Sequence, residues 1–163
     1  MFVNLKKAIL PGTFDPITNG HINLINRAIK IFDYIFILVA NSLKKKQLFN
    51  LNERILHVKK ATRHLSNVRV VGINSLTMHF AKRKNINIII RGIRNIFDFE
   101  YELKMLKMNK FLYPEIESVF MISDDHWSHV SSSMIKEIIY YGGNVDLLIP
   151  RYIIQEIKMR VQE

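Results

Sequence analysis

The most distinctive chemistry lies in the segment Pro11–His21, where an apolar run meets a turn rich in glycine and proline. His21 follows this turn at the start of an amphipathic pattern, so its imidazole is expected in the first turn of a helix. Backbone N–H groups at a helix N-terminus, together with the Thr13 hydroxyl, would suit a bound anion. The helix dipole disfavours a cationic imidazole there, but the ring can still donate a hydrogen bond to a phosphate oxygen. A simple turn with a structural histidine fits the same residues.

Basic side chains form two further candidate sites. Arg91 and Arg94 flank Gly92 at the end of an apolar run, and guanidinium groups make paired, charge-assisted hydrogen bonds to phosphate. Lys44, Lys45 and Lys46 follow another apolar run, where a lysine triplet is also typical of a solvated loop.

Two carboxylates and a serine block complete the candidates. Asp98 and Glu102 are four residues apart, so on a helix they would share a face, either as a functional pair or as ordinary surface charges. The segment Trp127–Ser133 ends in three serines whose hydroxyls could cap a helix and hold phosphate oxygens. His126 and His129 have no clear partners for a metal, so no resident metal site is predicted.

Apolar strands and amphipathic helices alternate along the whole chain and must position these residues. The patterns predict strands at about 7–10, 34–40, 68–72, 87–91 and 117–122. They predict helices at about 19–32, 52–65, 76–84, 97–113, 131–142 and from Pro150 onward.

This alternation predicts an α/β fold with a doubly wound, mostly parallel five-stranded sheet and helices on both faces. In such folds the ligand site lies outside the carboxyl ends of the strands, where nearly all the candidate residues fall. We expect one domain over residues 1–163, with a C-terminal helical segment at about 145–163.

Composition narrows the class of protein further. The 163 residues include no cysteine, which excludes disulfides and thiolate chemistry and fits a reducing compartment. We find neither a membrane span nor a secretory signal in the sequence, and we expect a cytoplasmic protein. The net charge of +10 suits a polyanionic partner, although enrichment in Ile, Asn and Lys produces such a charge without a functional cause.

Together, these motifs resemble those of the bacterial phosphopantetheine adenylyltransferases, a family of the HIGH-type nucleotidyltransferase superfamily. The resemblance covers nearly the whole chain and rests on five blocks in order: Gly12–His21, the lysine loop before Phe49, Ile90–Arg94, Asp98–Glu102 and Trp127–Ser133. The first block alone would indicate only the superfamily.

The resemblance implies adenylyl transfer from ATP, with Mg²⁺ carried on its phosphates, to 4′-phosphopantetheine, forming 3′-dephospho-coenzyme A and pyrophosphate. His21 would stabilise the transition state and Lys45 would act at the attacking phosphate. Residues implied to bind the acceptor are Thr13, Lys45, Thr77 and Arg91. Residues implied to line the ATP site are Thr13, Phe14, His21, Gly92, Ile93, Arg94, Glu102, Trp127, Ser128, His129, Val130, Ser131, Ser132 and Ser133.

The family also implies a homohexamer and feedback inhibition by coenzyme A. Ser75 and Thr77 depart from the family pattern, with Ser75 replacing Asp and Thr77 replacing an apolar residue. Two alternatives remain: a related nucleotidyltransferase acting on nicotinamide mononucleotide or glycerol 3-phosphate, and a basic nucleic-acid-binding protein. Against the second, no basic stripe with stacking aromatics is present and two carboxylates would lie in the groove, so neither nucleic acid nor membrane is expected as a partner.

Overall fold

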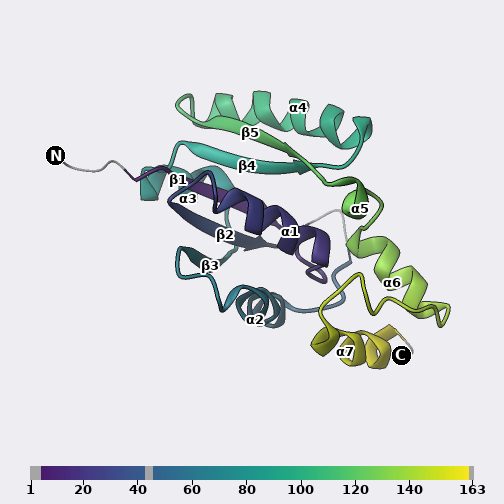
Figure 1. The fold of residues 1–163 in the computed structure, drawn as a ribbon. Coiled ribbons are helices and arrows are strands. Elements are labelled where there is room, and N and C mark those ends of the chain that lie inside the picture. The colour runs from purple at the N-terminus through teal and green to yellow at the C-terminus, as the bar shows by residue number, and fades with distance from the viewer. Residues whose placement is uncertain (1–4, 43–45, 162–163) are drawn as a thin grey trace.

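The computed structural model describes residues 5–42 and 46–161. Five strands form one sheet in which every pairing is parallel, in the order β3-β2-β1-β4-β5 (Figure 1). The strands are β1 (Lys7–Gly12), β2 (Tyr34–Ala40), β3 (Val68–Ile73), β4 (Ile88–Ile93) and β5 (Glu117–Ile122). The helices are α1 (Asn19–Ala28), α2 (Leu51–Thr62), α3 (Thr77–Lys84), α4 (Ile96–Leu112), α5 (Asp125–Ser128), α6 (Ser132–Tyr140) and α7 (Arg151–Val161). This architecture confirms the predicted doubly wound fold.

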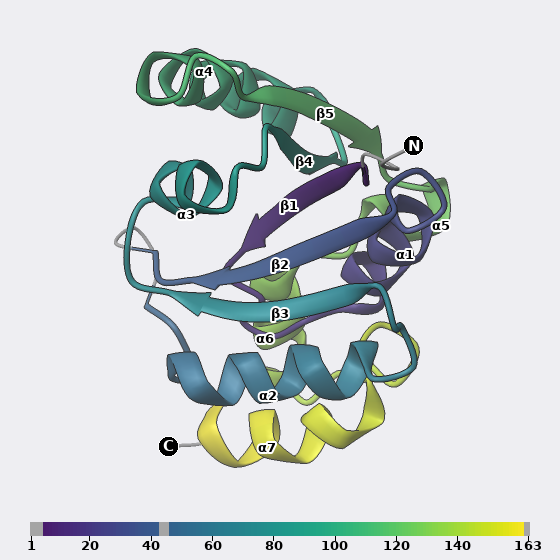
Figure 2. The same cartoon turned by 90° about the vertical axis from the view of Figure 1, so that its left-hand side faces the viewer.

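The strands alternate their side chains between two apolar cores. On one face, Ala8 and Leu10 of β1 join buried residues of α1, α2, α6 and α7. On the other face, Ile9 joins buried residues of α3 and of the segment that follows α4. The period of two along a strand explains why neighbours in sequence enter opposite cores. Because α7 contributes Ile153, Ile154 and Ile157 to the first core, it is a packed element of the domain (Figure 2).

Strand β1 is paired over fewer residues with β4 than with β2. Six residues of β1 are in register with β2, from Lys7 opposite Tyr34 to Gly12 opposite Val39, whereas the register with β4 is Ile9 opposite Ile89. Chain order reverses at this point, since β2 and β3 lie on one side of β1 and β4 and β5 lie on the other. A crevice at the carboxyl ends of β1 and β4 is therefore the expected ligand site of this topology.

Some boundaries differ from those predicted. Helix α1 ends at Ala28 instead of Phe32, because Lys30 and Ile31 donate to carbonyls three residues back, which tightens and ends the helix. Strand β1 continues through Pro11 to Gly12, and the four-residue helix α5 is too short to show a period in the sequence. Among the described residues, no helix is long and apolar enough to cross a membrane.

Candidate active site

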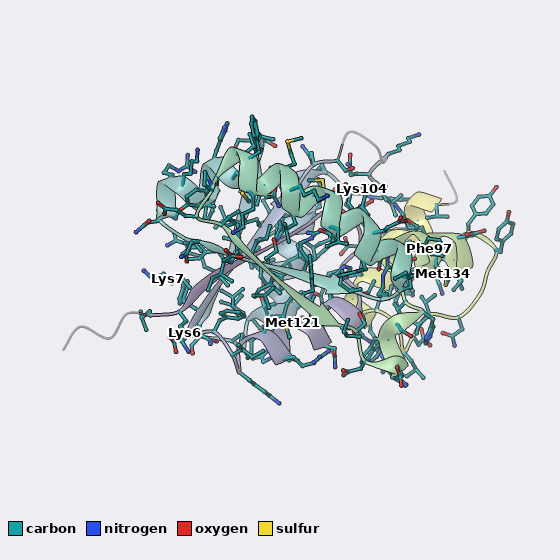
Figure 3. The ribbon with its side chains drawn as sticks, turned by 90° about the horizontal axis from the view of Figure 1, so that it is seen from above. Lys6, Lys7, Phe97, Lys104, Met121 and Met134 are labelled. Atoms are coloured by element: carbon teal, nitrogen blue, oxygen red, sulfur yellow. The ribbon has the colours of Figure 1, made fainter. Side chains whose placement is uncertain are left out.

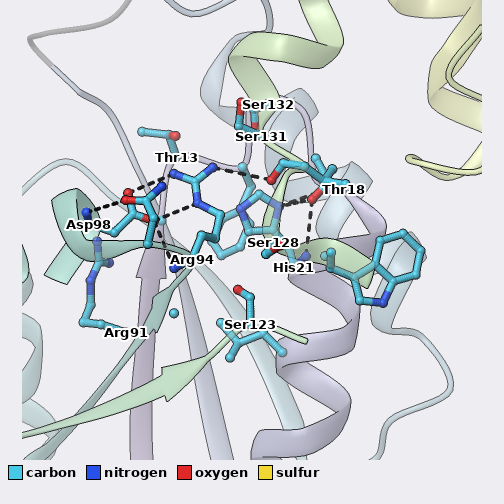
Figure 4. Close-up of a pocket in the computed structure, with 18 of the residues that line it drawn as sticks. Thr13, Thr18, His21, Arg91, Arg94, Asp98, Ser123, Ser128, Ser131 and Ser132 are labelled. Atoms are coloured by element: carbon cyan, nitrogen blue, oxygen red, sulfur yellow. Dashed lines mark hydrogen bonds and ion pairs between the residues drawn. The ribbon is translucent and has the colours of Figure 1, made fainter. Parts of the chain in front are cut away.

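A cavity of about 680 Å³ lies at the carboxyl ends of β1 and β4 (Figure 4). Its walls come from the turn after β1, from α1, from the β4–α4 segment and from the segment that leads through α5 into α6. The lining includes these residues singled out in the sequence: Thr13, Phe14, His21, Arg91, Gly92, Arg94, Asp98, Glu102, Trp127, Ser128, His129, Val130, Ser131, Ser132 and Ser133. The fold thus brings four separate motifs to one concave surface.

Two residues of the predicted set, Thr77 and Ile93, stand apart from this surface. Thr77 begins α3 and Ile93 is buried, 4% exposed, and neither lines the cavity. Lys45 lies outside the described residues, so its predicted role stays a prediction.

The first turn of α1 determines how His21 presents its ring. The Thr18 backbone N–H donates to Nδ1 of His21 at 3.0 Å, and the Thr18 side chain accepts from the His21 backbone N–H at 3.3 Å, which together form a capping box. Because Nδ1 accepts this hydrogen bond, the proton of the neutral ring belongs on Nε2. The cap therefore sets the tautomer as well as the start of the helix.

Phe14 packs against His21, and its own backbone conformation is uncommon. Its φ of 49° lies in the left-handed region, and its ring is buried with its centroid 5.1 Å from that of His21, edge to face. A Cβ atom on Gly12 would lie 2.8 Å from the Phe14 ring, so glycine leaves the space that this ring occupies. The turn is thus shaped by the packing of Phe14 between Gly12 and His21.

Two arginines at the end of β4 are each paired with a carboxylate of α4. Arg91 donates to Glu102 at 2.5 Å and to the Pro11 carbonyl at 2.6 Å, and Glu102 is buried. Arg94 binds both oxygens of Asp98 and lies 3.4 Å from the Val130 carbonyl, so it reaches across the cavity (Figure 4). Both guanidinium groups are therefore held at the cavity by fixed partners.

These ion pairs set the ionisation of Asp98. Burial by itself would raise the pKa of Asp98, but the hydrogen bonds and charge of Arg94, with the charge of Arg91, hold that pKa below its ordinary value. Asp98 is consequently ionised at neutral pH.

The serine block, Ser131–Ser133, forms another part of the cavity wall. Ser131 caps α6 by accepting from the Met134 backbone N–H at 3.1 Å, and Ser132 donates to the Pro16 carbonyl at 2.8 Å. Ser128 donates to the Asp125 carbonyl within α5. Capping of α6, predicted from the serines, is confirmed, and the N-terminus of α6 opens on the cavity.

The sequence analysis did not identify Arg54, which joins three separate segments of the chain. Arg54 of α2 is fully buried and donates to the carbonyls of Thr13, Ala40 and Phe49, at 2.7, 2.8 and 3.0 Å. It also donates to the Asn41 side chain. Burial lowers the pKa of Arg54, and the nearby Asp15 carboxylate acts in the opposite direction. The signal was its spacing from Val58, which puts a charged residue on the apolar face of a helix.

Asp15 and Lys136 form a second connection that the motifs did not reveal. The buried Asp15 carboxylate accepts from the backbone N–H groups of Leu48 and Phe49, both at 2.9 Å, and from the Lys136 ammonium at 3.0 Å. The basic residue after the serine block is therefore engaged with the turn after β1. Asp15 and Arg54 together attach residues 48–49 to that turn.

The class of protein follows from this fold and site. Residues 9–138 match the family model described as cytidylyltransferase-like. A solved structure described as a putative nicotinate-nucleotide adenylyltransferase from Vibrio parahaemolyticus superposes with a TM-score of 0.69 at 14% identity, covering 95% of this chain and 92% of that one. At that identity the likeness concerns the fold alone.

The curated relatives identify the family more specifically. The chain is 64% identical over 157 residues to a phosphopantetheine adenylyltransferase of Wigglesworthia glossinidia brevipalpis, covering 96% of this chain and 94% of the relative. It is 49% identical to the phosphopantetheine adenylyltransferase of Blochmanniella pennsylvanica, with 93% and 88% covered, and 45% identical to that of Sodalis glossinidius, with 96% and 98% covered. The chain belongs to the phosphopantetheine adenylyltransferase family, as the resemblance of its motifs implied.

A first testable prediction concerns the ion pair between Arg94 and Asp98. Replacing Arg94 by Gln removes the charge and side-chain hydrogen bonds that hold the pKa of Asp98 down, so that pKa should rise. A carbon-detected NMR titration of the carboxyl groups measures it. Because the folded-state pKa is depressed, Asp98 contributes stability above its unfolded pKa, and this contribution is lost as pH falls through the folded value.

Arg27→Gln is the matched control, since Arg27 pairs with Asp124 at 2.9 Å and has no contact with Asp98. An unchanged Asp98 pKa in Arg94→Gln would contradict the assignment of Arg94 as the cause.

Proposed function

We propose that this protein transfers an adenylyl group reversibly from ATP to 4′-phosphopantetheine, giving 3′-dephospho-coenzyme A and pyrophosphate. The observation that carries the proposal is the single cavity that gathers His21, two arginines and a serine-capped helix N-terminus. This is a donor set for several phosphate groups at once. The names of the curated relatives support phosphopantetheine as the acceptor.

The chemistry would be direct in-line displacement. An oxygen of the acceptor phosphate forms a bond to the α-phosphorus of ATP, and the bond from that phosphorus to the bridging oxygen breaks, so pyrophosphate leaves with the electron pair. The acceptor phosphate is already ionised at neutral pH and needs no general base. Catalysis then depends on positioning and charge stabilisation.

Each wall of the cavity would have a part in this reaction. His21 would donate from Nε2 to the α-phosphate as negative charge builds there, because Nδ1 is occupied by Thr18. Thr13, Arg91 and Lys45 would hold the attacking phosphate, and Thr77 would contact the pantetheine arm. Arg94 and Ser131–Ser133 would hold the leaving pyrophosphate. Phe14, Gly92 and the segment Trp127–Val130 would border the nucleotide.

Glu102 would bind hydroxyls of the ribose, as the family implies, while it also holds Arg91 in place. We propose that Mg²⁺ enters with the triphosphate, since Asp98 and Glu102 are each engaged by an arginine. Within residues 5–42 and 46–161, no group of three potential metal-binding side chains lies together. When bound, Mg²⁺ would neutralise phosphate charge. The cytoplasm is the compartment we propose, which the cysteine-free sequence fits.

The deciding assay measures pyrophosphate release from the purified protein with Mg-ATP. Release is expected with 4′-phosphopantetheine and not without it. Nicotinamide mononucleotide and glycerol 3-phosphate serve as parallel acceptors for the related reactions on this fold. Release with one of these, but not with phosphopantetheine, would overturn the proposed substrate.

His21 gives the sharpest mutational test of the mechanism. His21→Ala should lower kcat by about 10²–10³, the usual cost of losing one transition-state donor. Steady-state kinetics measures the effect, and circular dichroism verifies the fold. His64→Ala is the matched control, because His64 is an exposed histidine of the α2–β3 connection outside the cavity. Near-normal kcat in His21→Ala would remove His21 from the mechanism.

Helix α4 supports the proposed homohexamer. Glu102 is its only buried residue, whereas Phe97, Met108 and Phe111 are 76%, 53% and 82% exposed. Figure 3 shows Phe97 and Lys104 projecting from this helix. Apolar side chains around a 17-residue helix favour coverage by another copy of the chain. The hexamer would also be the form on which coenzyme A exerts the proposed feedback.

Sedimentation velocity tests the assembly. The wild-type chain should sediment as a hexamer, and Phe111→Glu should shift it to smaller species by placing a charge in the apolar contact. Leu56→Glu is a comparable change at an exposed position of α2, 63% exposed, and should leave the hexamer intact. A monomeric wild-type chain at micromolar concentration would contradict the proposal.

A further inference from the structure

The C-terminal helix α7 lies along α2 (Figure 2), and its last turn reaches the segment that leads into α2. Arg160 of α7 donates to the Leu48 carbonyl at 3.1 Å and to a carboxylate oxygen of Glu53 at 3.0 Å. It also donates to the second oxygen of Glu53, and its guanidinium lies 4.7 Å from the centre of the Phe49 ring. One side chain thus contacts Leu48, Phe49 and Glu53, at the start of α2 and in the segment before it.

Residues 48 and 49 belong to neither a helix nor a strand, so side chains from distant elements bind their backbone. Asp15 accepts from both N–H groups, Arg54 donates to the Phe49 carbonyl, and Arg160 donates to the Leu48 carbonyl. Backbone polar groups that are withdrawn from water need such partners. Two of these three residues, Asp15 and Arg160, are far away from the segment in the sequence, so its position depends on tertiary contacts.

Glu53 strengthens the same connection. Its carboxylate accepts from the Asn50 backbone N–H at 2.8 Å, while Asn50 caps α2 by accepting from the Glu53 backbone N–H at 3.1 Å. The hydrogen bond from Arg160 lowers the pKa of Glu53, against the opposing effect of burial. Arg160 therefore connects the capping box of α2 with the Leu48 backbone.

We infer that Arg160 is a positioning residue of the active site, which fixes Leu48, three residues after Lys45 in the sequence, against the turn after β1. This inference rests on the proposed function for its effect on catalysis. Arg160 itself lies on α7, outside the cavity lining, and acts through the backbone of Leu48 and the cap of α2.

The contacts make the effect selective. The segment that Arg160 holds follows Lys45, the proposed acceptor-side lysine, by three residues in the sequence. The ATP-side residues instead lie on α1, the β4–α4 segment and the serine block. Loss of Arg160 should therefore weaken use of the acceptor more than use of ATP. A general loss of folding would instead reduce the amount of active enzyme and leave both KM values unchanged.

The test compares Arg160→Ala with Lys158→Ala. Lys158 lies on the same helix, carries the same charge and is exposed, so its removal matches the change in charge without the contacts. Arg160→Ala should raise the KM for 4′-phosphopantetheine or lower kcat by about tenfold, since small misplacements near reacting groups are costly. The KM for ATP should stay within about twofold of the wild-type value. Arg160→Lys should restore only part of the loss, because an ammonium lacks the planar fork.

Hydrogen–deuterium exchange separates this inference from the proposed function, because it needs no activity. The amides of Leu48 and Phe49 should exchange at least about fivefold faster in Arg160→Ala than in Lys158→Ala, with the β1 amides unchanged. Unchanged exchange at 48–49 would overturn the inference even if the wild-type enzyme makes dephospho-coenzyme A. If Arg160→Ala and Lys158→Ala lost activity equally, the effect of Arg160 would be that of its charge alone, and the positioning role would be rejected. Faster exchange in a protein without adenylyl transfer would retain the positioning role and reject the proposed reaction.

Discussion

The structure depends on one constraint: irregular backbone at the carboxyl ends of a parallel sheet must find partners for its polar groups. The turn after β1, the end of β2 and residues 48–49 meet there, and none of them continues a helix or strand ladder. Arg54 supplies hydrogen bonds to all three from a fully buried position. Replacing this side chain would leave several buried carbonyl oxygens without donors, each a substantial cost. The position of the cavity wall at Thr13 therefore depends on a buried cation that does not itself line the cavity.

The positive charges at the cavity are paired with carboxylates of the protein itself. Arg91 and Arg94 are held by Glu102 and Asp98, so their charges are partly compensated before any ligand arrives. Incoming phosphates would compete with these carboxylates for the same guanidinium protons. This lowers the gain from binding, but it keeps both side chains oriented and reduces the entropy lost when a phosphate is bound. For a reaction that depends on positioning, orientation before binding favours the transition state.

Helix α4 connects the cavity to the proposed assembly. Its one buried side chain is the Glu102 carboxylate that holds Arg91, while apolar residues such as Phe97 and Phe111 remain exposed. An ordinary amphipathic helix is held to its domain by an apolar stripe. Here a polar contact to Arg91 joins the packing of Phe99 on Phe120 in attaching the helix, and apolar surface stays exposed that the proposed hexamer would cover. Assembly would therefore stabilise the element that carries Asp98 and Glu102, and so would link the hexamer to the geometry of the site.

The sequence by itself determined the fold class and the place of the site. Alternating apolar strands and amphipathic helices specify a parallel, doubly wound sheet, and the motifs at the strand ends converge because those ends share one edge. The cap at Ser131 is local, so the sequence predicted it too. Only the tertiary structure decided that Arg54, Asp15 and Arg160 meet at residues 48–49, since Arg160 and Leu48 are 112 positions apart. Periodicity and capping report interactions within a turn or two, whereas these contacts arise from how the elements pack.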